Sequence, residues 1–193
     1  MALPDYAAIS TGTAIIFADS THSPAANYNL GTRTIQIDCT DLAAGAAREC
    51  VKFDFGATWA TEMVLASCVE WETTPEVAAG DRLDFHIGYS HSATAAVGNP
   101  ANLTGADAAY TGMTGGTLAG SIVSIPFIGS HIMDNTINTD MPQVDTDVAT
   151  FTPRARYGIL VVHNPSTNAA ALHSDMIETS FRIQPLRLSL EDT

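Results

Sequence analysis

The chain has 193 residues, of which 46% are hydrophobic and only 15% are charged, against about a quarter in an average globular protein. Its formal net charge is −13, and Lys52 is the one lysine among its eight basic residues. Such an acidic protein repels phosphate backbones and anionic membrane surfaces, so we expect neither nucleic acid nor a membrane as a direct partner. The length suits a single domain, 1–193, whose core needs no disulfide or metal.

The first twenty residues contain no basic segment and no long apolar run, so we expect no signal peptide and synthesis in a cytoplasm. No stretch approaches the ~18 apolar residues of a membrane span. The three cysteines, Cys39, Cys50 and Cys68, form no C-x-x-C pair, which agrees with a reducing compartment. Cys39 continues the apolar parity of Ile35 and Ile37 and is expected in the core; a Cys39–Cys50 bridge across a hairpin is the alternative.

Apolar and polar residues alternate with a period of two along most of the chain, which is typical of half-buried β-strands. In chain order, we expect strands at residues 13–17, 34–39, 51–55, 63–71, 83–89, 122–128, 157–162 and 177–183. The runs 122–128 and 157–162 are more continuously apolar and predict central strands. A short helix at 41–47 is an alternative, because Asp41 could cap it, although Gly45 weakens it.

One-sided alternation favours antiparallel sheets, because parallel strands are covered on both faces. Roughly eight such strands in one domain predict an all-β fold, an antiparallel two-sheet sandwich of jelly-roll-like form. Two insertions interrupt the strand pattern, and we expect long loops at about 90–120 and 130–150. The first is rich in Gly, Ala, Thr and Asn, and the second in Asp. Loops of this length in compact domains are generally functional or mobile.

The six histidines form neither an H-x-H nor an H-E-x-x-H motif. His86 alternates with apolar neighbours and is expected to point away from the core, which argues against a cupin-type metal site. We therefore expect no essential metal at His86, His91 or the 140–147 segment. Calcium bound by Asp140, Asp145 and Asp147 is the alternative, although the glycine and bidentate glutamate of an EF-hand are missing.

Other catalytic patterns are equally hard to find. No G-x-S-x-G motif is present, and no G-K-[ST] follows the glycines of 112–116. Glu70 and Glu72, which flank Trp71, are expected on a solvent face by their parity, which argues against a glycosidase pair. We assign no catalytic, cofactor-binding or metal-binding residue and expect a protein that is not an enzyme.

The 90–120 loop is the expected interface. Leu103, Tyr110 and Met113 are its bulky side chains, and Tyr110 is the best candidate for an exposed anchor. The loop has few apolar groups to bury within its own domain, so we expect a partner or a sister subunit to order it. A sugar-binding platform could be lined by Trp59, Trp71, Tyr89 and Tyr110, but parity places Trp71 and Tyr89 on core faces.

Several segments resemble small all-β virion proteins of tailed bacteriophages, of the kind that decorate or cement a capsid. They are DLAAGAAR at 41–48, VEWETTP at 69–75, GADAAYTG at 105–112 and FTPRARYG at 151–158. The similarity lies in an Ala-, Thr- and Gly-rich, lysine-poor texture over most of the chain. The resemblance implies a jelly roll or Ig-like sandwich that forms trimers with itself and binds the major capsid protein, with no cofactor. It also implies synthesis in the host cytoplasm and a place on the outer capsid surface of the virion.

Three functions follow in order of preference. The first is a capsid decoration or cement protein that stabilises a phage shell. The second is a tail- or fibre-associated binding module that recognises a host glycan, and the third is a jelly-roll hydrolase or metal enzyme. Contacts with a shell lattice, binding to a glycan array, or a tightly held metal would favour the first, second or third of these.

Overall fold

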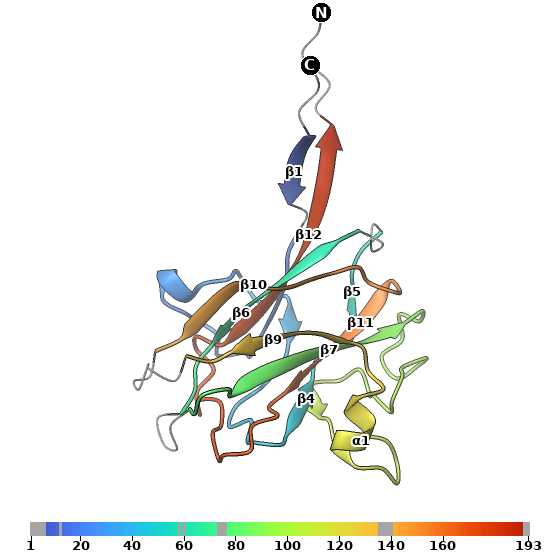
Figure 1. Cartoon of the computed structure of the whole chain (residues 1–193). Helices are drawn as coiled ribbons and strands as arrows, with labels where there is room; N and C mark the ends of the chain where they lie inside the picture. The colour runs from blue at the N-terminus through green and yellow to red at the C-terminus, as the bar shows by residue number, and fades with distance from the viewer. Residues whose placement is uncertain are drawn as a thin grey trace, which may run out of the picture.

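The computed structural model describes residues 7–11, 13–57, 59, 61–72, 77–134 and 141–190 (Figure 1). The described chain is almost entirely β-structure and forms two six-stranded sheets that share one core. The helical elements among these residues are a 3₁₀ turn, η1 (Ala26–Tyr28), and the short α1 (Leu118–Ile122). The expected all-β, largely antiparallel sandwich is confirmed, with more strands than expected, and its jelly-roll winding stays a prediction.

The first sheet is built around β12, the longest of its strands. Its order is β10 (Gln143–Phe151), β6 (Met63–Val69), β12 (Ser180–Leu190), β2 (Ile15–Ala18) and β3 (Ile35–Gln36), and β1 (Ala7–Thr11) also pairs with β12. All of these pairs are antiparallel except β2 with β3.

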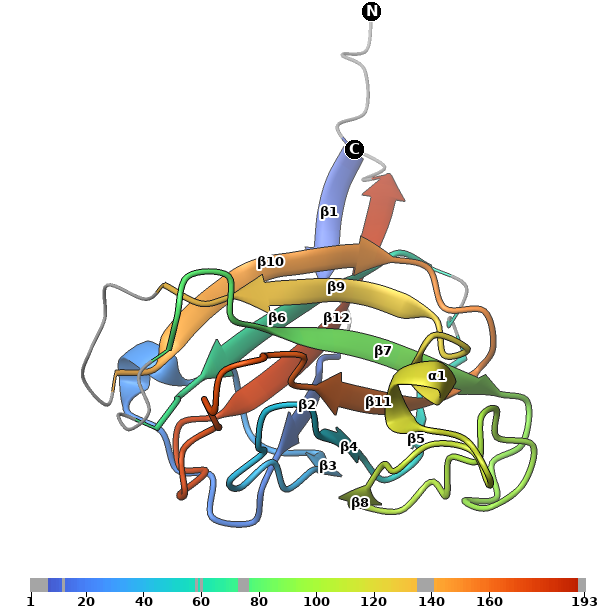
Figure 2. The ribbon, with the colours of Figure 1, turned by 60° about the horizontal axis from the view of Figure 1, so that its bottom comes forward.

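The second sheet is built around β11 and is antiparallel throughout. Its order is β8 (Ala108–Ala109), β4 (Ala47–Glu49), β11 (Tyr157–His163), β7 (Arg82–Ser90) and β9 (Phe127–Ile132), and β5 (Phe53–Asp54) also pairs with β11. The edge strands β9 and β10 of the two sheets lie side by side (Figure 2).

The core lies between the two sheets and contains the apolar faces that the alternation predicts. Phe181 of the first sheet and Phe85 of the second meet edge to face, with 5.2 Å between ring centroids, and both are fully buried. Phe17 and Phe53 make a similar contact at 4.8 Å. Such aromatic pairs add about 0.5–1.5 kcal/mol beyond the area that they bury. Cys39 is buried, as expected, and all three cysteines are free thiols.

A two-stranded ribbon extends away from the sandwich (Figure 1). It consists of β1 and the end of β12, paired from Ala7 opposite Leu190 to Thr11 opposite Leu186. Of the described strands, only β12 pairs with β1. The ribbon therefore has two open strand edges and no third strand in this part of the chain.

The expected central strand at 122–128 is wrong. Residues up to Ile122 belong to α1, the next residues form a turn, and β9 begins only at Phe127. The hydroxyl of Thr117 caps the helix by accepting a hydrogen bond from the Gly120 N–H. Pro126 lacks the N–H that a central strand needs, and Val123 is 79% exposed, so the apolar run does not reflect a buried strand.

The prediction of a long loop at 130–150 is also wrong for the described residues of that range. β9 continues to Ile132 and β10 begins at Gln143, while residues 135–140 lie outside the described part. β10 is an edge strand with no buried residue, so it carries aspartates on exposed positions instead of an apolar stripe. Asp140 lies outside the described residues, and with it part of the expected acidic segment.

The alternative helix at 41–47 is not formed. The segment makes turns in which Asp41 and Gly45 have positive φ values of 52° and 75°, and β4 begins at Ala47. Within the described residues, no helix is long and apolar enough to cross a membrane.

Candidate functional site

The 90–120 segment is held in place by a buried cation. The Lys52 ammonium donates hydrogen bonds to the Ser90 hydroxyl at 3.2 Å and to the main-chain oxygens of Ser92, Thr94 and Val97 at 3.2, 2.7 and 2.9 Å. Lys52 is only 9% exposed, so these oxygens take the place of its water shell. Several main-chain carbonyls around one ammonium fold the first part of the loop into a compact turn.

A buried carboxylate holds the next part of the same segment. Glu49 is 1% exposed and accepts hydrogen bonds from the main-chain N–H and hydroxyl of Thr104 and from the Gly105 N–H. Burial raises the pKa of Glu49, while the Thr104 and Gly105 donors act in the opposite direction. Lys52 and Glu49 therefore give this loop hydrogen-bond partners within its own domain, and a contact of the loop with a partner or a sister subunit stays a prediction.

The three interface candidates have different environments. Leu103 and Tyr110 are 4% and 3% exposed and belong to the domain's own core, and the Tyr110 hydroxyl donates to the Ala101 main-chain oxygen at 2.9 Å. The interpretation of Tyr110 as an exposed anchor is therefore wrong, since Tyr110 and Leu103 both fasten the loop onto the second sheet. Met113 is 41% exposed, so a contact between Met113 and a partner stays a prediction.

A cluster of metal-ligating side chains lies where the sequence indicates none. One carboxylate oxygen of Glu70, one ring nitrogen of His173 and one carboxylate oxygen of Asp175 all lie within 4.8 Å of one another. Glu70 was expected on a solvent face, and this is wrong, since it is 5% exposed. Glu70 and His173 are too far apart in the sequence for motif spacing to reveal the cluster. The available signals were the Glu-x-Glu pattern at 70–72 and the His-x-Asp pattern at 173–175.

Two of the other histidines, His86 and His131, form hydrogen bonds typical of packed positions. His86 lies on the face opposite Phe85, as expected, but it is buried because the 122–127 segment covers it, and its Nδ1 lies 3.1 Å from the Ile125 main-chain oxygen. Burial lowers the pKa values of His86, His131 and His163.

Ser67, His131 and Asp145 are the residue types of a hydrolase triad, but their placement does not suit catalysis. The Ser67 hydroxyl and His131 Nδ1 are 2.6 Å apart, and Asp145 lies opposite Ser67 in the β10–β6 pair. Ser67 is fully buried and His131 is 2% exposed, so no substrate reaches the hydroxyl. This hydrogen bond joins β6 of the first sheet to β9 of the second, and we interpret it as structural.

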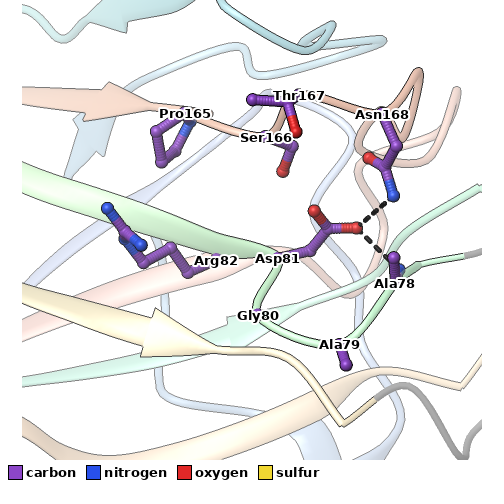
Figure 3. Close-up of a pocket in the computed structure, with 9 residues that line it drawn as sticks. All are labelled: Ala78, Ala79, Gly80, Asp81, Arg82, Pro165, Ser166, Thr167 and Asn168. Carbon is purple, nitrogen blue, oxygen red and sulfur yellow. Dashed lines mark hydrogen bonds between the residues drawn. The ribbon is translucent and has the colours of Figure 1, made fainter.

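The pocket in Figure 3 is a small, polar hollow of about 260 Å³ between the start of β7 and the turn after β11. One carboxylate oxygen of Asp81 accepts hydrogen bonds from the Asn168 side chain and the Ala78 N–H, both at 2.7 Å. Its nine lining residues include no aromatic side chain on which a sugar could stack. Trp71 is 5% exposed and Tyr89 packs against the core, so the expectation that both lie on core faces is confirmed.

Comparison with known proteins adds no relative: no family model matches the chain, and no curated protein and no solved structure is detectably similar to it.

Proposed function

We propose that the protein is a structural component of a phage virion, a capsid decoration or cement protein that associates with copies of itself and with the major capsid protein. The resemblance of its Ala-, Thr- and Gly-rich segments to such proteins supports the virion role. The observation that carries the self-association is the projecting β1–β12 ribbon (Figure 1).

The ribbon offers open strand edges to a partner. Its register runs from Ala7 opposite Leu190 to Thr11 opposite Leu186, and among the described strands only β12 pairs with β1. An open strand edge carries unpaired main-chain N–H and C=O groups, which pair readily with a strand of another chain. An isolated two-stranded ribbon is marginally stable in water, so this one gains stability when strands of a second copy pair with its edges.

The charge distribution favours a second copy of the same chain as the partner of the ribbon. The chain has a net charge of −13, whereas the described ribbon residues include a single charged residue, Arg187. Five residues of strand extend about 16 Å at ~3.3 Å each, which exceeds the ~8 Å Debye length at physiological salt. Ribbons of neighbouring copies can therefore meet while their acidic sandwiches stay far enough apart for salt to screen their repulsion. A trimer around the ribbons would present three sandwiches to a capsid lattice, where multivalency strengthens weak contacts.

The experiment is a comparison of two variants that add the same charge at neighbouring positions of β1, Ile9→Asp at its one large apolar residue and Ser10→Asp at a polar one. Analytical ultracentrifugation should show an oligomer for the wild-type chain and for Ser10→Asp, and a monomer for Ile9→Asp. All three should keep the same far-UV circular dichroism, because the sandwich core lies elsewhere. A wild-type monomer at all concentrations tested would refute the self-association.

The capsid role has its own measurement. Wild-type protein added to empty shells of the phage that encodes it should co-sediment with them and raise their disassembly temperature. Ile9→Asp should bind more weakly, because it loses multivalency. An oligomer that never binds shells would leave the ribbon's role intact and refute the decoration function.

A further inference from the structure

A short antiparallel bridge between two neighbouring segments places Glu70 and His173 opposite each other. Trp71 pairs with Leu172, the His173 N–H donates to the Glu70 main-chain oxygen at 3.1 Å, and the Glu72 N–H donates to that of Ala171 at 3.0 Å. This register places Glu70 directly opposite His173, so their side chains share one face of the bridge.

The turn after His173 adds a third ligand to that face. The Asp175 N–H donates to Nδ1 of His173 at 3.2 Å, which brings the Asp175 side chain back toward the imidazole. The carboxylate of Glu72 accepts a hydrogen bond from the Ser174 N–H at 2.7 Å and fixes the same turn from the neighbouring segment. The ligand atoms of Glu70, His173 and Asp175 thus converge, all within 4.8 Å of one another.

We propose that Glu70, His173 and Asp175 bind a divalent first-row transition metal ion such as Zn²⁺, independently of the function proposed above. One imidazole and two carboxylates form a mixed nitrogen and oxygen set, which suits Zn²⁺ or its neighbours better than Ca²⁺ or Mg²⁺, which prefer oxygen ligands alone. This departs from the sequence-based expectation that the protein has no metal-binding residue.

The geometry needs a small contraction, and the exposure of the ligands shows where it occurs. Zn²⁺ ligands lie about 2.0–2.2 Å from the ion, so donor atoms around a tetrahedral ion are about 3.4 Å apart. Glu70, 5% exposed, forms the fixed inner wall of the site. The side chains of His173 and Asp175 are 17% and 53% exposed, and Asp175 has the freedom to close on the ion. Three protein ligands leave a fourth position for water or for a group from a neighbouring molecule.

The test uses the full-length chain, freed of metal with EDTA and titrated with Zn²⁺, Mn²⁺ and Ca²⁺ by isothermal titration calorimetry at pH 7.5. The variants are His173→Ala and Asp175→Asn, and the control is His91→Ala, which removes an exposed histidine far from the cluster in the sequence. We expect one Zn²⁺ per wild-type chain, at least tenfold weaker binding for His173→Ala, and a smaller weakening for Asp175→Asn. His91→Ala should match the wild type.

Substitution with Co²⁺ gives a second readout, because the visible spectrum reports nitrogen and oxygen coordination directly. The bands should appear with wild-type protein and disappear with His173→Ala. Absence of Zn²⁺ binding at 100-micromolar concentrations would overturn the proposal, and so would equal losses in His173→Ala and His91→Ala or a preference for Ca²⁺ over Zn²⁺.

Discussion

Replacing Lys52 with methionine should destabilise the protein substantially, because the ammonium is the common donor for a whole turn. Methionine keeps the unbranched apolar stem of lysine but is one atom shorter and has no donor, so the oxygens of Ser90, Ser92, Thr94 and Val97 lose a shared partner. A hydrogen bond to a charged group contributes about 1.5–3 kcal/mol.

The four bonds are not additive, and removing a buried charge offsets part of the loss. Some carbonyls also regain water, since much of the 91–99 turn is exposed. We therefore expect a loss of about 3 kcal/mol in the free energy of unfolding, the equivalent of one to two charged hydrogen bonds. For a chain of this size, this loss lowers the Tm by about 6–12 °C.

Urea denaturation followed by tryptophan fluorescence measures the global change, and amide hydrogen exchange locates it. Exchange should accelerate at residues 92–105 and remain unchanged in β11. The control is Arg156→Met, which removes a cation whose ion pair with Asp54 is exposed at the surface and should change stability far less. If Lys52→Met stays within about 0.5 kcal/mol of the wild type and loop exchange is unaltered, the buried ammonium does not organise the segment.

The same physical reasoning makes three further predictions. Tyr110→Ala should lower the free energy of unfolding by about 3–5 kcal/mol because it empties a core site, whereas Met113→Ala should change it by no more than about 0.5 kcal/mol. If urea denaturation shows similar small losses for both variants, Tyr110 is not a core residue. Gly88→Ala should cost about 1–3 kcal/mol, since a Cβ would lie 2.2 Å from the Leu103 Cδ1, and a neutral result would mean that Leu103 moves freely. The free energy of unfolding should fall as the pH drops from 7 to 5, because burial lowers the pKa of His131 and other packed histidines and the unfolded chain therefore binds more protons. His131→Gln should make the free energy of unfolding depend less on pH, and an unchanged dependence would exclude His131 as a contributor.

Alternation along the sequence predicts the fold class because it depends only on local geometry. Phe85 and Ile87 point inward from β7 because successive strand residues face opposite sides, and Phe181 and Ile183 do so from β12. Where a strand lies at an edge, as β10 does, this signal weakens: Val148, Ala149 and Phe151 pack against the core, but no residue of the strand is fully buried.

The amino-acid sequence by itself therefore determined a β-sandwich, the inward faces of most of its strands, the burial of Cys39 and an acidic composition with a single lysine. It did not determine what Lys52, Glu49 or Tyr110 contact, and it predicted an exposed Glu70 where the structure has a buried one. Only the tertiary structure decided these, because Lys52 finds its oxygens 38 to 45 residues away, and Glu70 meets His173 through a bridge between distant segments. Such contacts depend on the order and register of paired strands, which arise from packing of the whole domain and leave no periodic pattern in the local sequence.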